Sequence, residues 1–284
     1  MTRQDIFTLT QSKYNIEKEF NKINTLFETY IVVHFNSLDF GSYKFTIETL
    51  VTEKLFLNWK QRGSYFSCQE LRNDIGFTLD DYSENNIITA LEYYSNLIYL
   101  IDKNIKYQNS LAYQFSKEFY ILKQNIDILL DHLNHEKLII DEEEKVLLIP
   151  KNLSARAVAK ISSTETSQAI LKYNHAALRG NIVEKRNILN NIYLEYETLL
   201  DNPIDNYKEF FKKAKQLYNN LHIRHDNRTT KNNKNPKINI DDETLEKWYD
   251  ELYQLILFCV LIKDNLERKS HVDEFLKSIK GAKE

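Results

Sequence analysis

The stretch LIIDEEEKVLLIP, at residues 138–150, places two short β-prone runs around an acidic turn. Apolar runs joined by a short polar turn are typical of a β-hairpin. The residues before and after this stretch follow helical patterns instead. The sequence therefore predicts an all-α protein in which one short β-hairpin, the only sheet we expect, separates a helical domain at residues 1–150 from a helical bundle at residues 151–284.

The composition favours long helices on both sides of this hairpin. The chain of 284 residues has only five glycines and three prolines, the residues that most often end helices. It also has 18 tyrosines and 15 phenylalanines, which supply ample apolar area for packed cores. A chain of this length suits two domains.

Apolar residues spaced four and three apart predict a long opening helix in the first block. This stripe consists of Ile16, Phe20, Ile23, Phe27, Tyr30 and Ile31. We expect further helices at residues 45–61, 68–75, 84–101 and 107–135. Ser67 and Glu70 form a capping box for the short second of these, in which each side chain accepts from the other residue's amide, and Gly76 stops the helix.

A short helix, a turn and a longer helix at residues 67–101 resemble a helix-turn-helix. A DNA-reading version needs basic or amide side chains at the start of the second helix. That start carries Asp80, Asp81 and Glu84, which phosphates would repel. Simple helical packing is therefore favoured over DNA recognition.

In the second block we expect one helix from Ser154 to a break at Gly180, and a second capped by Asn181 that runs through Leu200. A third helix spans residues 205–221, and a polar loop at residues 222–240 leads to a last helix at residues 243–268. Asp205 caps the third helix, and Asp241 or Asp242 the last.

The last helix carries an apolar stripe that exceeds what one small bundle must bury, and this predicts a homodimer. The stripe consists of Trp248, Leu252, Leu255, Ile256 and Cys259.

The sequence also argues against export, membrane insertion and zinc binding through cysteine. Its richest apolar run, residues 252–262, is too short to span a bilayer, and the N-terminus lacks the features of a signal peptide. Cys68 and Cys259 are too few to hold zinc and are expected to be buried free thiols. We therefore expect a cytoplasmic protein with no membrane partner, no metal and no other cofactor.

The formal net charge of −3 hides a concentrated basic segment. Residues 208–237 contain nine lysines or arginines and two acids, so this segment carries +7 and the remainder carries −10. A local excess of this kind is typical of a surface that binds nucleic acid.

The segment His222-Ile223-Arg224-His225-Asp226-Asn227-Arg228 gathers the groups that metal-independent RNA cleavage needs. Histidine exchanges protons near neutral pH, and arginine grips phosphate and stabilises the charge that develops on it. Two alternatives remain open. The histidines simply end a helix whose dipole favours a cation there, or His222, His225 and Asp226 bind a metal, for which their spacing is a poor match.

A second polar cluster consists of Tyr173, Asn174, His175 and Arg179. His175 and Arg179 are four residues apart and are expected to share a helix face. The interpretations left open are a plain helix surface and a face turned toward the first cluster.

Four groups of residues resemble the C-terminal domains of bacterial abortive-infection (antiphage) proteins, which belong to the HEPN superfamily. They are Tyr173-Asn174-His175, Gly180-Asn181 with Lys185-Arg186, residues 223–227, and Trp248-Tyr249-Asp250. The resemblance covers residues 153–284 and implies a helical bundle that dimerises and places two copies of an Arg-x4-6-His motif in one RNA-cleaving cleft. Arg224 matches the opening of that motif. The closing histidine is absent, since positions 229–231 are Thr229, Thr230 and Lys231.

We consider two hypotheses for function. In the first, the protein is an RNase or RNA-targeting toxin in phage defence. Arg224, His225, Asp226, Asn227 and His222 form its catalytic cluster, and Arg228, Lys231, Lys234 and Lys237 hold RNA. The first domain then senses a phage or host trigger. In the second, the protein is a non-catalytic helical module that binds a phage or host protein or RNA. A nuclease should bring two Arg224-His225 pairs together across a dimer, whereas an interaction module need not.

Overall fold

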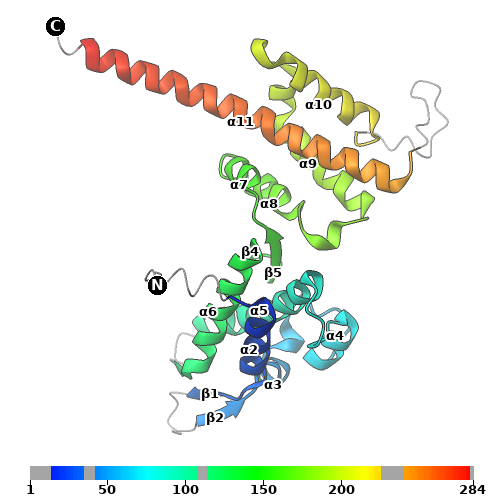
Figure 1. The fold of residues 1–284 in the computed structure, drawn as a ribbon, viewed down its shortest axis with the longest axis vertical. Coiled ribbons are helices and arrows are strands. Elements are labelled where there is room, and N and C mark those ends of the chain that lie inside the picture. The colour runs from blue at the N-terminus through cyan, green and yellow to red at the C-terminus, as the bar shows by residue number, and fades with distance from the viewer. Residues whose placement is uncertain (1–13, 35–41, 108–113, 225–239, 282–284) are drawn as a thin grey trace, which may run out of the picture. The chain divides into compact units, whose positions relative to one another are not determined.

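The computed structural model describes residues 14–34, 42–107, 114–224 and 240–281. The chain is mostly helical, as its few glycines and prolines predict, and the described residues form ten α-helices (Figure 1). They divide into two compact units, at residues 1–151 and 152–284, and each unit has its own apolar core. Independent folding of the two predicted domains stays a prediction.

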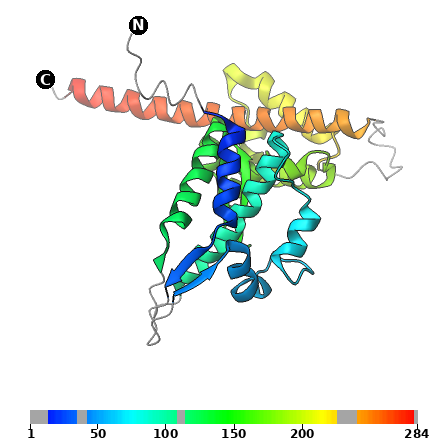
Figure 2. The same ribbon diagram turned by 60° about the horizontal axis from the view of Figure 1, so that its bottom comes forward.

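The first unit is built around the long helix α5. Its helices are α2 (Ile16–Glu28), α3 (Ile47–Lys54), α4 (Cys68–Ile75), α5 (Glu84–Tyr107) and α6 (Lys117–His132), with a 3-10 turn, η1, at Phe56–Asn58. Helices α3 and α6 pack against α5, and α2 lies along α6, as Figure 2 shows. Phe20, Ile23 and Phe27 of the predicted opening stripe are fully buried.

The predicted hairpin is confirmed. Strands β4 (His135–Ile140) and β5 (Lys145–Pro150) pair antiparallel, with Leu138 opposite Leu147 and Ile140 opposite Lys145. Val146 and Leu148 alternate inward against α5. An alternating strand with one buried face is what a hairpin packed on a helix requires.

The prediction that this hairpin is the only sheet was wrong. Strands β1 (Ile31–His34), β2 (Ser42–Phe45) and β3 (Gln114–Phe115) form a second antiparallel sheet in the order β2-β1-β3. The opening helix ends at Glu28, because the run Ile31-Val32-Val33 is β-branched and loses side-chain freedom in a helix. The helices expected at 45–61 and 107–135 are correspondingly shorter.

The short helix α4 has the predicted caps. The Ser67 hydroxyl accepts from the Glu70 amide at 3.2 Å, and Gly76 ends the helix in the left-handed region at φ 76°. Glu70 reaches back to the Phe66 amide, at 2.8 Å, and not to the Ser67 amide as predicted.

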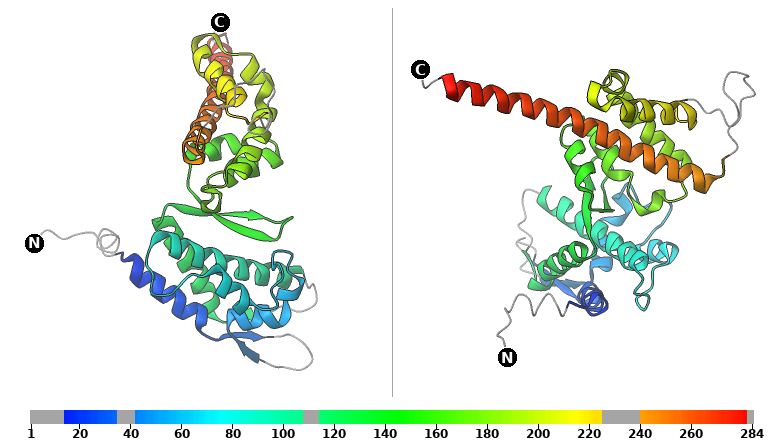
Figure 3. Two further views of the ribbon diagram at one scale, coloured as in Figure 1. Left: turned by 90° about the vertical axis from the view of Figure 1, so that its right-hand side faces the viewer. Right: turned by 45° about the horizontal axis from the view of Figure 1, so that its top comes forward.

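The second unit is a helical bundle (Figure 3). Its elements are α7 (Leu153–Ala159), α8 (Thr164–Lys172), η2 (Ala176–Leu178), α9 (Ile182–Asp201), η3 (Asp205–Tyr207), α10 (Lys208–Asn220) and α11 (Asp242–Gly281). Helix α11 packs against α7, α9 and α10. The one helix expected from Ser154 is two helices and a 3-10 turn, and α11 continues well beyond the expected end at Arg268.

The apolar stripe of α11 serves the core of its own unit. Leu252, Ile256 and Cys259 are completely buried there, whereas Trp248 is 46% exposed. Most of the stripe is therefore core and not the surplus surface from which we predicted a homodimer, and the homodimer stays a prediction. In the described part of the chain, no helix is long and apolar enough to cross a membrane.

Candidate functional site

The candidate site lies where α10 ends. Leu221 follows the helix, and its carbonyl accepts a hydrogen bond from the Tyr249 hydroxyl at 3.1 Å. His222 then adopts a left-handed backbone, with φ 59°, and only 5% of it is exposed. Ile223 is equally buried, so the chain is anchored into the core immediately before it reaches Arg224.

Arg224 is the first residue after this anchor to face solvent. Its side chain is 51% exposed, and its Nη2 lies 3.7 Å from Oε1 of Glu197 on α9, a side chain that is itself 36% exposed. An ion pair as open as this contributes at most about 1 kcal/mol to stability. Glu197 therefore orients the guanidinium but leaves it accessible to an anion.

Two stacked tyrosines lie close enough to Arg224 to be influenced by its charge. The rings of Tyr193 and Tyr218 are parallel with centroids 3.5 Å apart, and the Tyr218 hydroxyl donates to Oδ1 of Asn190 at 2.6 Å. Burial raises the pKa of both phenols, and the positive charge of Arg224 opposes this only in part. Both tyrosines stay protonated at neutral pH and do not serve as proton acceptors.

The other residues of the predicted first cluster lie outside the described residues. They are His225, Asp226, Asn227, Arg228, Lys231, Lys234 and Lys237. Within the described ranges, no group of three or more histidine, cysteine, aspartate or glutamate side chains is placed to hold a metal ion.

Carboxylates pair with three lysines of the basic segment on α10. Lys208 pairs with Asp205 at 2.5 Å, Lys212 with Glu209 at 3.1 Å and Lys215 with Asp201 at 2.8 Å. Two of these carboxylates precede the segment in sequence, so the charge count of residues 208–237 overstates the positive potential along α10. Arg224, by contrast, is well exposed, and more cations follow it in the sequence. Asp205 itself begins the turn η3 and does not cap α10 as predicted.

The second polar cluster is spread over the turn between α8 and α9. The Tyr173 hydroxyl donates to Oδ1 of Asp250 at 2.8 Å, and the Asn174 amide donates to the Tyr253 hydroxyl at 3.1 Å. His175 and Arg179 flank the turn η2 and do not share an α-helix face. The His175 ring accepts from the Ala177 amide at 3.3 Å, which gives it a capping role.

Lys185 joins this cluster, although the sequence pointed to it only as part of the resemblance and not as a member of the cluster. Its side chain is 7% exposed, and its Nζ lies 2.7 Å from Asp250 and 2.8 Å from Glu246. The ammonium also lies 5.1 Å from the centre of the Tyr173 ring. One available signal was its helical spacing from Ile182 and Leu189, which places it on the buried face of α9.

Glu246 completes this network. Its carboxylate oxygens each accept from the Gly180 amide at 3.0 Å. Partial burial raises the pKa of Glu246, but the hydrogen bonds from Lys185 and Gly180 outweigh burial and hold that pKa below its ordinary value. Because a buried cation is surrounded by its carboxylates, the network ties α9 and α11 to the turn before α9 and presents no free acid or base.

The two polar clusters stand at different levels of α9. Lys185 and Glu197 are twelve residues apart, which is about 18 Å along a helix axis. The structure therefore does not bring Lys185 and its partners to Arg224.

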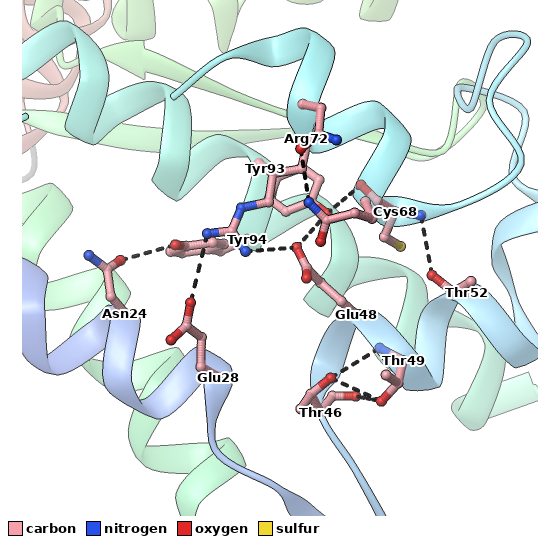
Figure 4. Close-up of polar contacts among 12 residues, drawn as sticks. Asn24, Glu28, Thr46, Glu48, Thr49, Thr52, Cys68, Arg72, Tyr93 and Tyr94 are labelled. Atoms are coloured by element: carbon pink, nitrogen blue, oxygen red, sulfur yellow. Dashed lines mark hydrogen bonds and ion pairs between the residues drawn. The ribbon is translucent and has the colours of Figure 1, made fainter. Parts of the chain in front are cut away.

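The first unit contains a second buried polar network, which the sequence did not reveal (Figure 4). Arg72 of α4 lies 3.3 Å from Glu48 of α3 and 3.8 Å from Glu28 of α2. Glu48 also accepts from the Tyr93 hydroxyl of α5 at 2.9 Å, and that hydroxyl lies 3.1 Å from the Cys68 carbonyl. The network thus joins the four consecutive helices α2, α3, α4 and α5.

Neither cysteine has a reactive thiol. Cys68 and Cys259 are both buried and unpaired, as the sequence predicted. Burial raises the pKa of Cys68 to about 11 and that of Cys259 to about 12. The thiolate needed for nucleophilic chemistry is therefore scarce at neutral pH.

A scan against protein-family models finds no match for this chain, and neither do searches of curated proteins and of solved structures.

Proposed function

We propose that the C-terminal unit binds RNA through Arg224 and the basic stretch after it, as an RNA-targeting protein of antiphage defence. The observation that carries the proposal is the exposure of Arg224 directly after a buried anchor, at the entrance to the basic stretch. That stretch contributes Arg228, Lys231, Lys234 and Lys237. The antiphage context comes from the resemblance to abortive-infection proteins.

Glu197 is consistent with this role for Arg224. A guanidinium can bind a phosphate through two hydrogen bonds, and such bonds are stronger than an open surface ion pair at 3.7 Å. A phosphate can therefore displace the Glu197 carboxylate at little cost. The ion pair keeps the side chain oriented toward solvent until RNA binds.

RNA cleavage without a metal is the activity that this binding would serve. Arg224 stabilises the negative charge that develops on the phosphate, and His225 accepts or donates the proton, with Asp226 and Asn227 beside it in sequence. His222 is too buried to reach RNA on the surface, so His225 carries proton transfer in this proposal. The N-terminal unit would act as the sensor of a phage or host trigger.

A non-catalytic interaction protein is the second candidate. It is favoured by the burial of His222, which removes one of the two predicted histidines of the cluster from the surface. Such a protein needs no proton-transfer group beside Arg224.

Binding and cleavage of total RNA separate these candidates. The variants are Arg224→Ala and His225→Ala, with Lys247→Ala as the control, because Lys247 is another exposed cation and is paired with Glu243 at 2.8 Å. For an RNase, Arg224→Ala should weaken binding, and His225→Ala should lower the cleavage rate about 100-fold or more while RNA still binds. A substitution at an exposed residue such as Arg224 typically changes stability by about 0.5 kcal/mol, so Arg224→Ala should stay folded, and circular dichroism checks both variants.

RNA binding without cleavage by the wild type would favour the second candidate. Salt is the further check, because displaced counterions make affinity for RNA fall steeply as salt rises. If the wild type binds no RNA even at low salt, the proposal is overturned.

A further inference from the structure

Helix α11 carries a second apolar stripe, which begins beside the core of its own unit, where Leu255 packs and Ile262 is buried, and continues along the exposed C-terminal part of the helix. Its residues are spaced alternately three and four apart, so they lie along one line of the helix. This spacing is typical of a coiled-coil seam. The seam consists of Leu255, Phe258, Ile262, Asn265, Lys269, Val272, Leu276 and Ile279. The core residues Leu252, Ile256 and Val260 lie off this line.

The two ends of this seam have different surroundings. At its start, Leu255 and Phe258 line a groove of about 840 Å³ between α10 and α11, whose other apolar walls include Phe210, Leu217 and Trp248. Phe258 is 43% exposed there, and Ile262 is almost buried at the next turn.

At its far end, the seam lies on the part of α11 that continues beyond the bundle, as Figures 1 and 3 show. Val272, Leu276 and Ile279 are 55%, 47% and 43% exposed, and Phe275 beside them is 64% exposed. A helix that leaves its bundle gains most of its stability from burying an apolar face, and these apolar residues all remain exposed.

The seam is complementary to itself when read in the opposite direction. Placing two copies antiparallel with residue 267 at the centre puts Leu255 opposite Ile279, Phe258 opposite Leu276, and Ile262 opposite Val272. The same register sets the two polar residues, Asn265 and Lys269, opposite each other. By symmetry each pair occurs twice, so apolar layers at both ends enclose a polar centre.

The flanking residues fit the same register. Phe275 meets Leu261 of the second copy, and Leu266 meets its own counterpart. Arg268 also meets its counterpart, but its charge is offset by Asp264, whose carboxylate lies 2.7 Å from the Arg268 Nε. All seven exposed large apolar residues of α11 therefore lie on the seam or beside it. They are Trp248, Phe258, Leu266, Val272, Phe275, Leu276 and Ile279.

We propose that two copies of this chain pair through α11 in antiparallel register, so that the C-terminal part of each α11 lies in the α10–α11 groove of the other. The occupant is a second copy because this chain supplies both the groove and the matching stripe. A parallel pair would set Lys269 against Lys269 and leave both grooves open. The interface is two-fold symmetric and closed.

Substitution within the seam tests this proposal on the full-length chain. Leu276→Asp should weaken dimerisation about 30-fold or more, because it places a charge in both apolar layers of the interface. Lys277→Asp is the matched control, because it changes the next residue, which projects about 100° further around the helix and away from the seam, and it should leave the dimer intact. Sedimentation measures the dimer, and circular dichroism checks that both variants keep their helices.

Cross-linking tests the register. In a mixture of Phe258→Cys and Leu276→Cys chains, a short bismaleimide should link residue 258 of one chain to residue 276 of the other. A parallel pair would instead link 258 to 258. Three results would overturn the proposal. They are a wild type that is monomeric at all working concentrations, equal weakening of the dimer by both charge variants, and cross-links only between like positions.

Discussion

Lys185 is a cation whose removal leaves two carboxylates facing each other on α11. Lys185→Met keeps most of the side-chain length but removes the charge that holds Glu246 and Asp250. We expect the free energy of unfolding to fall by about 3 kcal/mol, at the low end for a broken buried pair because the Asp250 side chain is 50% exposed. Urea unfolding measures this change.

The control for this prediction is Lys172→Met. Lys172 pairs with Glu184 at a similar distance of 2.8 Å, but the two side chains are 30% and 38% exposed. That substitution should cost less than about 1 kcal/mol. Equal losses in the two variants would show that burial of Lys185 adds nothing.

Glu246 makes the same network sensitive to acid. Because its folded pKa lies below its ordinary value of 4.5, its ionised form stabilises the fold. This contribution is complete above pH 4.5 and is lost as the pH falls through the depressed folded value. Unfolding measured from pH 6 to pH 3 should therefore show a smaller acid-dependent loss in Glu246→Gln than in the wild type. Identical pH profiles would contradict this assignment.

Among single residues, the sequence predicted those whose hydrogen-bond partners lie within a few positions along the chain. The caps formed by Ser67, Asn181 and Asp241 depend on side chains that bond amides three residues away, and all three are present. The ion pairs of Lys185 and Arg72 were not predicted, because their partners lie on other helices. A pairing across 65 residues, as between Lys185 and Asp250, leaves no local pattern to read.

At the scale of the elements, the spacing of apolar residues in the sequence predicted the helices and the hairpin but did not predict strand β1. A four-residue strand beside a helix shares its apolar residues with the helical pattern, so Ile31 fitted both interpretations. The partner strand β3 lies about 80 residues later in the chain, with Val33 opposite Phe115. The long reach of α11 was also missed, since its C-terminal part packs on no core that would shape its pattern.

The arrangement of α2, α3, α4 and α5 depends on Arg72. Its side chain is 17% exposed and contacts carboxylates from two other helices. Arg72→Met should lower the free energy of unfolding by about 2 to 3 kcal/mol, because Glu48 is left in a mostly buried site without its cation. Lys54→Met is the control, since its pair with Glu53 is 3.9 Å apart and more than half exposed. Thermal or urea unfolding of both variants decides, and a loss below 0.5 kcal/mol in Arg72→Met would refute this role.

For the whole molecule, the α11 pairing constrains how two sites can cooperate. Leu221 precedes Arg224 by three residues, and its carbonyl accepts a hydrogen bond from the Tyr249 hydroxyl. Tyr249 lies 18 residues before residue 267, the centre of the proposed α11 pair. The two copies of Tyr249 are then about 54 Å apart along the helix axis. Two Arg224 side chains would not share one cleft, so this pairing favours the non-catalytic candidate, in which each copy contacts RNA separately.

This consequence rests on the α11 pairing and has its own measurement. Spin labels at Asn219→Cys, an exposed position near the end of α10, should be more than about 45 Å apart in the dimer. Separations below about 30 Å would instead support a shared cleft of the kind that the resembled family forms.

The most direct test of the proposed function compares how tightly the wild type, Arg224→Ala and Glu197→Gln bind a single-stranded RNA. All three affinities are measured at one fixed salt concentration. Arg224→Ala should weaken binding about 10-fold, through loss of a charge-assisted phosphate contact. Glu197→Gln should strengthen it about threefold, because phosphate no longer competes with a carboxylate. The control Glu243→Gln, which removes another exposed, lysine-paired carboxylate, should leave affinity unchanged. Equal affinities for the wild type, Arg224→Ala and Glu197→Gln would contradict the assignment of Arg224 as the RNA contact.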